Sequence, residues 1–196
     1  MPAPSAADSE PARVAVRVWD LPTRLFHWLL AASIVASVVT AKIGGNAMVW
    51  HFRFGYVVFS LLLFRVLWGL MGGHWSRWAQ LPLRPTQVWA YLQGRSELLH
   101  RVGHNPLGSW SVLAMLFFLG FQVTTGLVSD DEIANSGPLV RFVAESTVSL
   151  ATRWHKGYGK TLILLLVAIH LLAILWYFIR KKENLTRAML TGNKTA

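Results

Sequence analysis

The chain contains four long apolar stretches, each long enough to cross a lipid bilayer as a single helix. They run from about residue 22 to 42, from 51 to about 71, from 106 to about 128 and from about 156 to 179. The hydrocarbon core of a bilayer is about 30 Å thick and requires about 20 apolar residues per helix. Since a spanning segment must satisfy its own backbone hydrogen bonds, the sequence predicts an all-α, integral membrane four-helix bundle with up-down topology.

The composition supports a membrane protein and excludes several kinds of chemistry. Of the 196 residues, 54% are hydrophobic and 14% are charged, which is too apolar for a soluble domain of this size. The chain has no cysteine, which excludes disulfides, thiolate catalysis, iron–sulfur clusters and covalently attached c-type haem. The net charge of +10 does not indicate nucleic acid, because the basic residues flank the apolar stretches rather than forming one stripe.

The distribution of Lys and Arg predicts the orientation. We expect an N-terminal tail over residues 1–20, a membrane domain over 21–180 and a basic C-terminal tail over 181–196. The tails and the middle loop carry most of the basic residues, so both termini are expected in the cytoplasm. These residues are Arg13, Arg17, Arg24, Arg77, Arg84, Arg95, Arg101, Arg180, Lys181, Lys182, Arg187 and Lys194. The other side carries Lys42, Arg141, Arg153, Lys156 and Lys160, together with the acidic run 130–132.

Two loops contain more apolar residues than a simple linker needs. Residues 82–101 predict a short helix on the cytoplasmic surface, and residues 137–153 predict a short segment on the outer surface. Each is either an interfacial connector or an element that docks a partner. The acidic run 130–132 is similarly either a solvated loop or a docking site for a basic redox partner.

Four histidines lie within the apolar stretches, where an ionisable side chain is costly and usually functional. His27 lies early in the first stretch, His51 and His155 begin the second and fourth, and His170 lies further along the fourth. Because successive spans run in opposite directions, the depths match His27 with His170 near the cytoplasmic face. They likewise match His51 with His155 near the outer face.

The spacing along the fourth stretch indicates two separate cofactors. His155 and His170 are fifteen residues apart, which in an α-helix is about 22 Å in height and about 60° around the axis. That height is too great for one shared metal ion. It suits two large flat groups held between facing helices of a bundle. We therefore predict two bis-imidazole haem sites, one above the other, with His27 and His170 on the inner iron and His51 and His155 on the outer iron.

Two glycines and one arginine fit the same arrangement. The pattern Trp-His-x-x-x-Gly occurs at residues 50–55 and again at 154–159, and a glycine four residues after a histidine lies on the same helix face. Gly55 and Gly159 are therefore expected to give clearance for a porphyrin edge. Arg65 lies fourteen residues after His51, about 40° away and about 21 Å deeper. We expect its guanidinium to pair with a haem propionate at the inner site.

Two such sites indicate transmembrane electron transfer, which we expect to run between a quinone pool and a periplasmic redox partner, but other functions could use the same residues. A stand-alone quinone-linked oxidoreductase could act on a small species such as superoxide, attracted by basic residues at the outer face. Those residues are Arg53, Arg153, Lys156 and Lys160. A non-haem metal-ion transporter could use the four histidines directly. His104 lies just before the third stretch. One interpretation gives it a structural role, at the helix cap or on the surface, and the other gives it a role in ligation or in contact with a quinone.

Several motifs together resemble the bacterial cytochrome b561 family over about residues 14–193. They lie at residues 25–28, 51–56, 65–69, 104–108, 129–131, 137–139, 168–170 and 184–189. The chain is most similar to the branch that includes the cytochrome b subunits of nickel–iron hydrogenases, although residues 74–78 follow the family pattern only loosely. The resemblance implies two b haems ligated by His27, His51, His155 and His170. It also implies a location in the bacterial inner membrane, in contact with lipids. The implied redox partners are a quinone and a periplasmic c-type cytochrome or enzyme complex, and the chain could form a homodimer.

Overall fold

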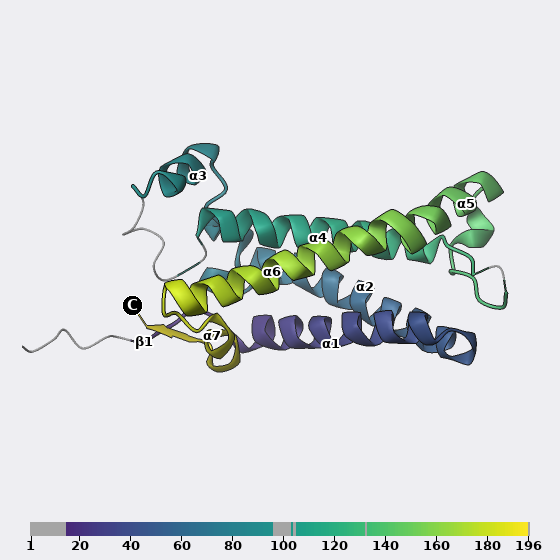
Figure 1. Cartoon of the computed structure of the whole chain (residues 1–196), viewed down its shortest axis with the longest axis horizontal. Helices are drawn as coiled ribbons and strands as arrows, with labels where there is room; N and C mark the ends of the chain where they lie inside the picture. The colour runs from purple at the N-terminus through teal and green to yellow at the C-terminus, as the bar shows by residue number, and fades with distance from the viewer. Residues whose placement is uncertain (1–14, 96–102, 104, 132, 196) are drawn as a thin grey trace, which may run out of the picture.

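Four long helices run in alternating directions through the molecule (Figure 1). The computed structural model describes residues 15–95, 103, 105–131 and 133–195. The long helices are α1 (Leu21–Ile43), α2 (Met48–Met71), α4 (Pro106–Leu127) and α6 (Lys160–Arg180). All four lie in helical segments long and apolar enough to cross a membrane. The predicted fold class is confirmed, and the first three spans begin and end within three residues of the predicted bounds.

The fourth span differs from the prediction. Helix α5 (Glu145–Trp154), one π-helical turn (His155–Gly159) and α6 form one continuous helical segment, 36 residues long. At about 1.5 Å per residue the segment is about 54 Å long, well above the thickness of a bilayer core. The prediction of a separate outer-surface segment over 137–153 is therefore wrong for its second half, which belongs to the helix. His155 consequently lies inside a helix and not at its start.

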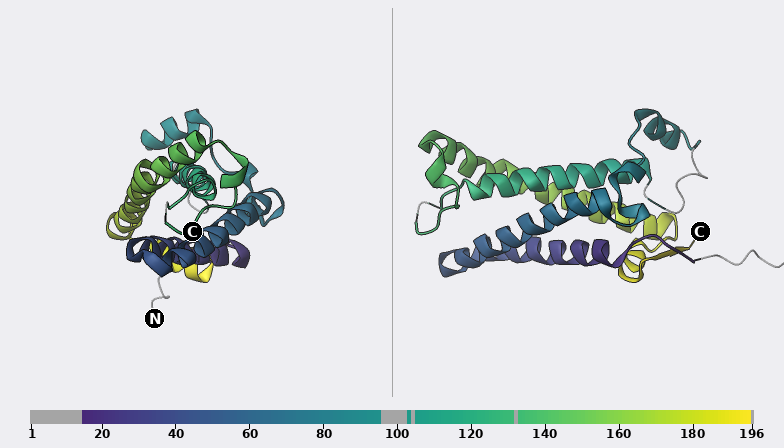
Figure 2. Two further views of the ribbon diagram at one scale, coloured as in Figure 1. Left: turned by 90° about the vertical axis from the view of Figure 1, so that its right-hand side faces the viewer. Right: turned by 180° about the vertical axis from the view of Figure 1, so that it is seen from behind.

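The apolar core is small and lies in the middle of the bundle. Helix α1 packs along α2, α2 also contacts α4, and α4 contacts α6, as the view along the bundle in Figure 2 shows. We call the buried core the midplane cluster; it consists of Val58, Leu119, Val123 and Ile163. Many other apolar side chains on the four helices are exposed, which suits a bundle surrounded by lipid. The two ends of the bundle are held by polar contacts instead.

Side-chain caps begin two of the spanning helices. The Asp20 carboxylate accepts a hydrogen bond from the Thr23 backbone N–H at 2.9 Å and caps α1. Asn105 caps α4 by accepting from the Gly108 N–H at 2.6 Å, and Pro106 follows at the first helical position. These caps satisfy N–H groups that have no partner within the helix. They explain why the helices begin at these residues.

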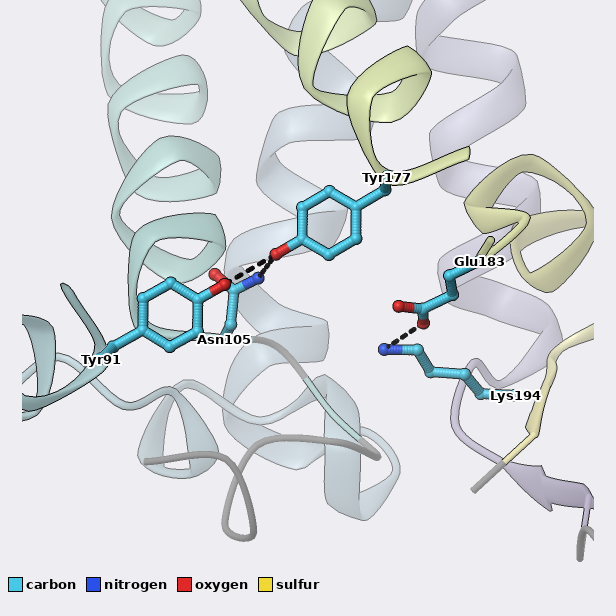
Figure 3. A network of polar contacts seen from close by, with 5 residues as sticks. All are labelled: Tyr91, Asn105, Tyr177, Glu183 and Lys194. Atoms are coloured by element: carbon cyan, nitrogen blue, oxygen red, sulfur yellow. Dashed lines mark hydrogen bonds and ion pairs between the residues drawn. The ribbon is translucent and has the colours of Figure 1, made fainter. Parts of the chain in front are cut away.

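The chain termini meet at one end of the bundle. Strand β1 (Ala15–Arg17) pairs antiparallel with β2 (Asn193–Thr195), which follows the short helix α7 (Leu185–Thr191). A 2.7 Å ion pair joins Lys194 to Glu183 (Figure 3). The segment predicted as a basic C-terminal tail is therefore mostly ordered, because it pairs with the N-terminal strand. We call this the termini end and the opposite one the far end.

Helix α3 (Pro85–Leu92) lies at the termini end and confirms a short helix within residues 82–101, of which 96–101 lie outside the described residues. The Tyr91 hydroxyl is 2.9 Å from that of Tyr177 on α6, and the Asn105 side-chain amide donates to the same Tyr177 oxygen (Figure 3). This network connects α3, the start of α4 and the end of α6.

Candidate cofactor sites

The four intramembrane histidines lie in two facing pairs at different levels of the bundle. The ring centroids of His27 on α1 and His170 on α6 are 6.4 Å apart, with an interplanar angle of 51°. Those of His51 on α2 and His155 in the π-turn are 5.9 Å apart, with an angle of 79°. We call the first the near pair, because it lies toward the termini end, and the second the far pair. Along the fourth helix, Ile163 of the midplane cluster lies between His155 and His170.

The spacing of each pair suits two axial ligands on one metal ion. An imidazole nitrogen binds a metal at about 2 Å, so rings on opposite sides of one ion have centroids roughly 6 Å apart. Each ring comes from a different helix, so each pair forms a donor set across the bundle. Within the described ranges, no group of three or more His, Cys, Asp and Glu side chains is placed to hold an ion. The chemistry of two facing imidazoles fits a haem iron.

The far pair is held in the tautomer that binds metals. His51 donates from Nδ1 to the Ser37 carbonyl at 2.9 Å, and the Ser37 hydroxyl is 3.0 Å from the same nitrogen. His155 donates from Nδ1 to the Gln122 carbonyl at 2.8 Å. Because a carbonyl only accepts, the proton must lie on Nδ1 and the lone pair on Nε2. Bonds of this kind orient metal-ligating histidines and raise their basicity.

The near pair has no such bonds within the described part of the chain. The Nδ1 atom of His27 is buried there without a hydrogen-bond partner. Buried polar atoms in folded proteins almost always have a partner, so an unpaired Nδ1 in a ring whose centroid is 6.4 Å from that of a second imidazole indicates a group missing from the protein alone. The donor set of two neutral imidazoles therefore fits a haem here too.

The two predicted glycines differ in their surroundings. A Cβ atom on Gly55 would meet no described atom within 4 Å, so the space beside His51 is open. At Gly159 the same position is filled by the side chains of Gln122 and Trp154. The expectation of open space at Gly159 is therefore wrong. This glycine instead allows α4 to approach the fourth helix closely.

Sequence reasoning missed three residues beside the far pair. Ser37 and Gln122 supply the carbonyls that accept from the histidines, and Gly126 makes room for the His155 ring. A Cβ atom on Gly126 would lie 2.7 Å from Cε1 of His155. Of these three residues, Gln122 could have been found from the sequence, because it is a long polar side chain within an otherwise apolar span.

Arg65 is buried near the end of α2, with an exposed fraction of 5%. Its Nη1 donates to the Ser76 carbonyl at 3.1 Å, and its guanidinium lies 4.1 Å from the centroid of a Trp78 ring. Gly69 lacks a side chain where Trp78 packs, and the Trp78 indole N–H donates to the Val66 carbonyl. Arg65 thus lies inside the bundle toward the termini end. Its pairing with a propionate stays a prediction.

Asp20 joins the start of α1 to the end of α2. Its carboxylate accepts from the Trp68 indole N–H at 3.1 Å and from the Ser76 hydroxyl at 2.8 Å, in addition to its bond from Thr23. Partial burial by itself would raise the pKa of Asp20, but these hydrogen bonds outweigh it and lower the pKa below its usual value. The carboxylate therefore stays charged and holds two helix ends together.

The acidic run at the far end is in part a structural cap. The Asp131 carboxylate accepts from the backbone N–H groups of Ile133, Ala134 and Asn135, each at 2.9 Å. Burial would raise the pKa of Asp131, but the bonds from Asn135 and its neighbours dominate and lower it well below the ordinary range. Asp131 therefore shapes its own loop. Glu132 and His104 lie outside the described residues, so the predictions that involve them stay predictions.

Known proteins similar to this chain are membrane cytochromes. The profile of the prokaryotic cytochrome b561 family matches residues 18–192. The probable Ni/Fe-hydrogenase B-type cytochrome subunit of Bradyrhizobium diazoefficiens is 25% identical over 93% of this chain and 87% of its own length. The corresponding protein of Cupriavidus necator is 25% identical over 92% and 87%. That of Azotobacter vinelandii is 34% identical over 54% of each. Because the family profile extends over nearly the whole chain, the protein belongs to the prokaryotic cytochrome b561 family, whose members are membrane proteins that bind haem b and transfer electrons.

Proposed function

We propose that the chain holds two b haems, one at each histidine pair, and carries electrons between a quinone pool and a periplasmic redox partner. The observation that carries this proposal is the presence of two facing imidazole pairs at two levels of one four-helix bundle. Two sites stacked along the membrane normal form a path for electrons from one face of the membrane to the other.

The protein's own residues define what each site does. Bound haem b supplies one-electron chemistry at its iron. His51 and His155 present Nε2 lone pairs to the far site, and the carbonyls of Ser37 and Gln122 keep the proton on Nδ1. If both histidines of a pair bound the iron, no coordination position would be left open, which would favour electron transfer over substrate activation. At the near site we assign Arg65 as the partner of a propionate. Its guanidinium is buried and has further N–H donors besides the one that bonds to the Ser76 carbonyl.

We further propose that the termini end faces the cytoplasm of a bacterial inner membrane. The β1–β2 pair brings both termini to one end, and most of the Lys and Arg residues outside the spans belong to the tails and the middle loop. The names of the relatives connect those proteins to a Ni/Fe-hydrogenase. A periplasmic enzyme of that kind, or a c-type cytochrome, is the partner we propose at the far end.

Haem content and single-histidine variants test the two sites. The detergent-purified protein should contain two haems b per chain and give sharp b-type bands after reduction with dithionite. His170→Ala should lose the near haem and His51→Ala the far haem, while His74→Ala, an exposed histidine at the termini end, should keep both. One haem per chain in the unmodified protein, or two in His170→Ala, would contradict the proposed pairs.

The electron path is tested separately in membrane vesicles. A quinol added to the oxidised protein should reduce both haems, and an oxidised c-type cytochrome on the far side should then reoxidise them. His51→Ala should still accept electrons from the quinol but should no longer pass them to that cytochrome. Unchanged transfer in this variant would contradict a path through the far site.

A further inference from the structure

His155 is held by one residue of α4 through two hydrogen bonds of opposite direction. The His155 ring donates from Nδ1 to the main-chain carbonyl of Gln122 at 2.8 Å. The Gln122 side chain donates from Nε2 to the main-chain carbonyl of His155 at 3.0 Å. The ring and the backbone of the histidine are therefore both fixed to the same point on the neighbouring helix.

The backbone that Gln122 contacts is a π-turn, His155–Gly159, between α5 and α6. Such turns, with bonds from residue i to i+5, are rare and often occur at functional sites. In an unbroken α-helix His155 and His170 would lie about 60° apart. A π-turn is wider and winds through a smaller angle per residue, so it brings the two histidines closer to one face. Gln122 donates to the main-chain carbonyl of His155, the first residue of this turn.

Close packing surrounds this contact. The Gln122 side chain occupies the space that a Cβ atom on Gly159 would need, at the end of the π-turn. Gly126, one helical turn further along α4, gives room to the His155 ring. The Gln122 Oε1 atom is buried without a partner among the described residues. Among the described residues, the bond from Nε2 to the His155 carbonyl is therefore the hydrogen bond that this side chain makes.

We propose that Gln122 is a positioning residue for the far haem site, which sets the rotation of the His155 ring relative to His51. The 79° angle between these rings is the property it maintains. The near pair has no equivalent contact in the described part of the chain, and its rings lie at 51°. This inference rests on the proposed binding of a haem between His51 and His155.

Electron paramagnetic resonance of the oxidised protein reads the ring angle directly. In low-spin ferric haem with two imidazole ligands, the largest g value rises as the ligand planes approach a right angle. His51→Ala and His170→Ala, each with a single haem, assign the signals to the two sites. In Gln122→Met, which keeps the length of the side chain and removes the amide, the far signal should move to a smaller g value and broaden. The near signal and the content of two haems should not change.

Two further variants calibrate this result. Gly126→Ala pushes on the His155 ring directly and should also shift the far signal. Thr124→Val is the matched control, because its side chain is exposed and, among the described residues, bonds only to the Gly120 carbonyl of its own helix. It should shift neither signal. If Gln122→Met does not accumulate in membranes, Gln122→Asn, whose amide is one carbon too short to reach His155, provides the same measurement.

The outcomes separate this inference from the proposed function. A far signal at its unmodified g value in Gln122→Met, with two haems bound, would overturn the positioning role. Loss of the far haem from that variant would also overturn it, because Gln122 would then be needed to form the site and not to orient the ring. An unmodified protein without two distinct haem signals would instead contradict the two-haem proposal itself.

Discussion

The two histidine pairs have similar spacing but are positioned by different means. In the far pair both rings donate to main-chain carbonyls, so contacts to the rings themselves set their orientation. In the near pair the buried Nδ1 of His27 has no partner among the described residues. There the nearest fixed points are helix ends: Asp20 lies seven residues before His27, and Tyr177 lies seven residues after His170. The far histidines are thus oriented by hydrogen bonds to their own rings. The near histidines are positioned through the hydrogen-bonded ends of the helices that carry them.

If each pair holds a haem, as proposed, this difference has a consequence for the potentials of the two haems. A hydrogen bond donated from Nδ1 makes an imidazole a stronger electron donor, which stabilises ferric iron and lowers the midpoint potential. The buried positive charge of Arg65 toward the termini end would stabilise ferrous iron and raise the potential of a haem at the near site. We therefore expect the far haem to have the lower potential. Electrons that enter at the far end would then move favourably toward the termini end, and transfer from a quinol to the far side would require an acceptor there with a higher potential than both haems.

The largest expected effect is the selective loss of the far site in Gly126→Val. Even a Cβ atom at this position would lie 2.7 Å from the His155 ring, and the branched side chain of valine leaves the ring no room. Haem extraction should find one haem per chain, with the potential of the near site. Gly120→Ala, on the same helix, meets no described atom within 4 Å and should keep two. Equal loss of haem in both variants would show that α4 tolerates no added side-chain volume at either position. The explanation that Gly126→Val acts by displacing the His155 ring would then fail.

The next effect tests the scaffold at the termini end. Asp20→Ala removes the cap of α1 and the bonds from Trp68 and Ser76, and should lower stability by about 1–2 kcal/mol. Because the pKa of Asp20 is lowered in the folded state, its contribution is present above the unfolded value of about 3.9. It is lost as the pH falls through the lower, folded value. Thermal unfolding between pH 6 and 3 should show a larger loss of stability in the unmodified protein than in Asp20→Ala, in which other carboxylates such as Asp131 still contribute.

The near haem should respond to the same change more than the far haem. Since α1 positions His27 through its capped end, fraying of that end should broaden the signal of the near site. The far signal depends on Ser37 and Gln122 and should keep its shape. Equal broadening of both signals would show that the cap of α1 affects the two sites alike. The proposed difference in how the two histidine pairs are positioned would then be wrong.

Much of this arrangement follows from the sequence because it depends on local or periodic properties. Hydropathy and length locate the spans, and the Asn105–Pro106 pair marks the start of α4, where the structure has the expected cap. Depth also follows from residue number, because a helix rises by a constant amount per residue. The four histidines therefore fall into facing pairs without any knowledge of packing.

The remaining features depend on contacts between distant parts of the chain. Residues 145–153 are polar enough to resemble a loop, but they continue the fourth helix beyond the membrane span. The π-turn at His155 is supported by Gln122, thirty-three residues earlier, and no local pattern predicts it. The β1–β2 pair joins the two ends of the chain. The helix period places Gly159 on the same helix face as His155. It does not predict that the side chain of Gln122 on α4 fills the space beside this glycine.

Arg65→Met tests the electrostatic half of the comparison. Methionine fills similar space and removes the charge, so the near haem should lose about 1 kcal/mol of stabilisation of its reduced state, or about 40 mV. The far haem should change by less, because it is about 20 Å higher along α2. Redox titration of the single-haem variants measures both. Arg53→Met, an exposed arginine over the Trp50 ring at the far end, should leave the near potential unchanged.

The smallest effect concerns the second contact to His51. Ser37→Ala removes the hydroxyl 3.0 Å from His51 Nδ1 but keeps the Ser37 carbonyl that accepts the ring proton. Loss of one weak neutral contact of about 0.5 kcal/mol should raise the far potential by about 20 mV. The tautomer and the EPR signal should not change, because the carbonyl fixes the proton on Nδ1. Ser33→Ala, at a buried serine one turn earlier in α1, is the matched control. A shift larger than that in Arg65→Met would mean that the hydroxyl, and not the main chain, is the main partner of the far histidine.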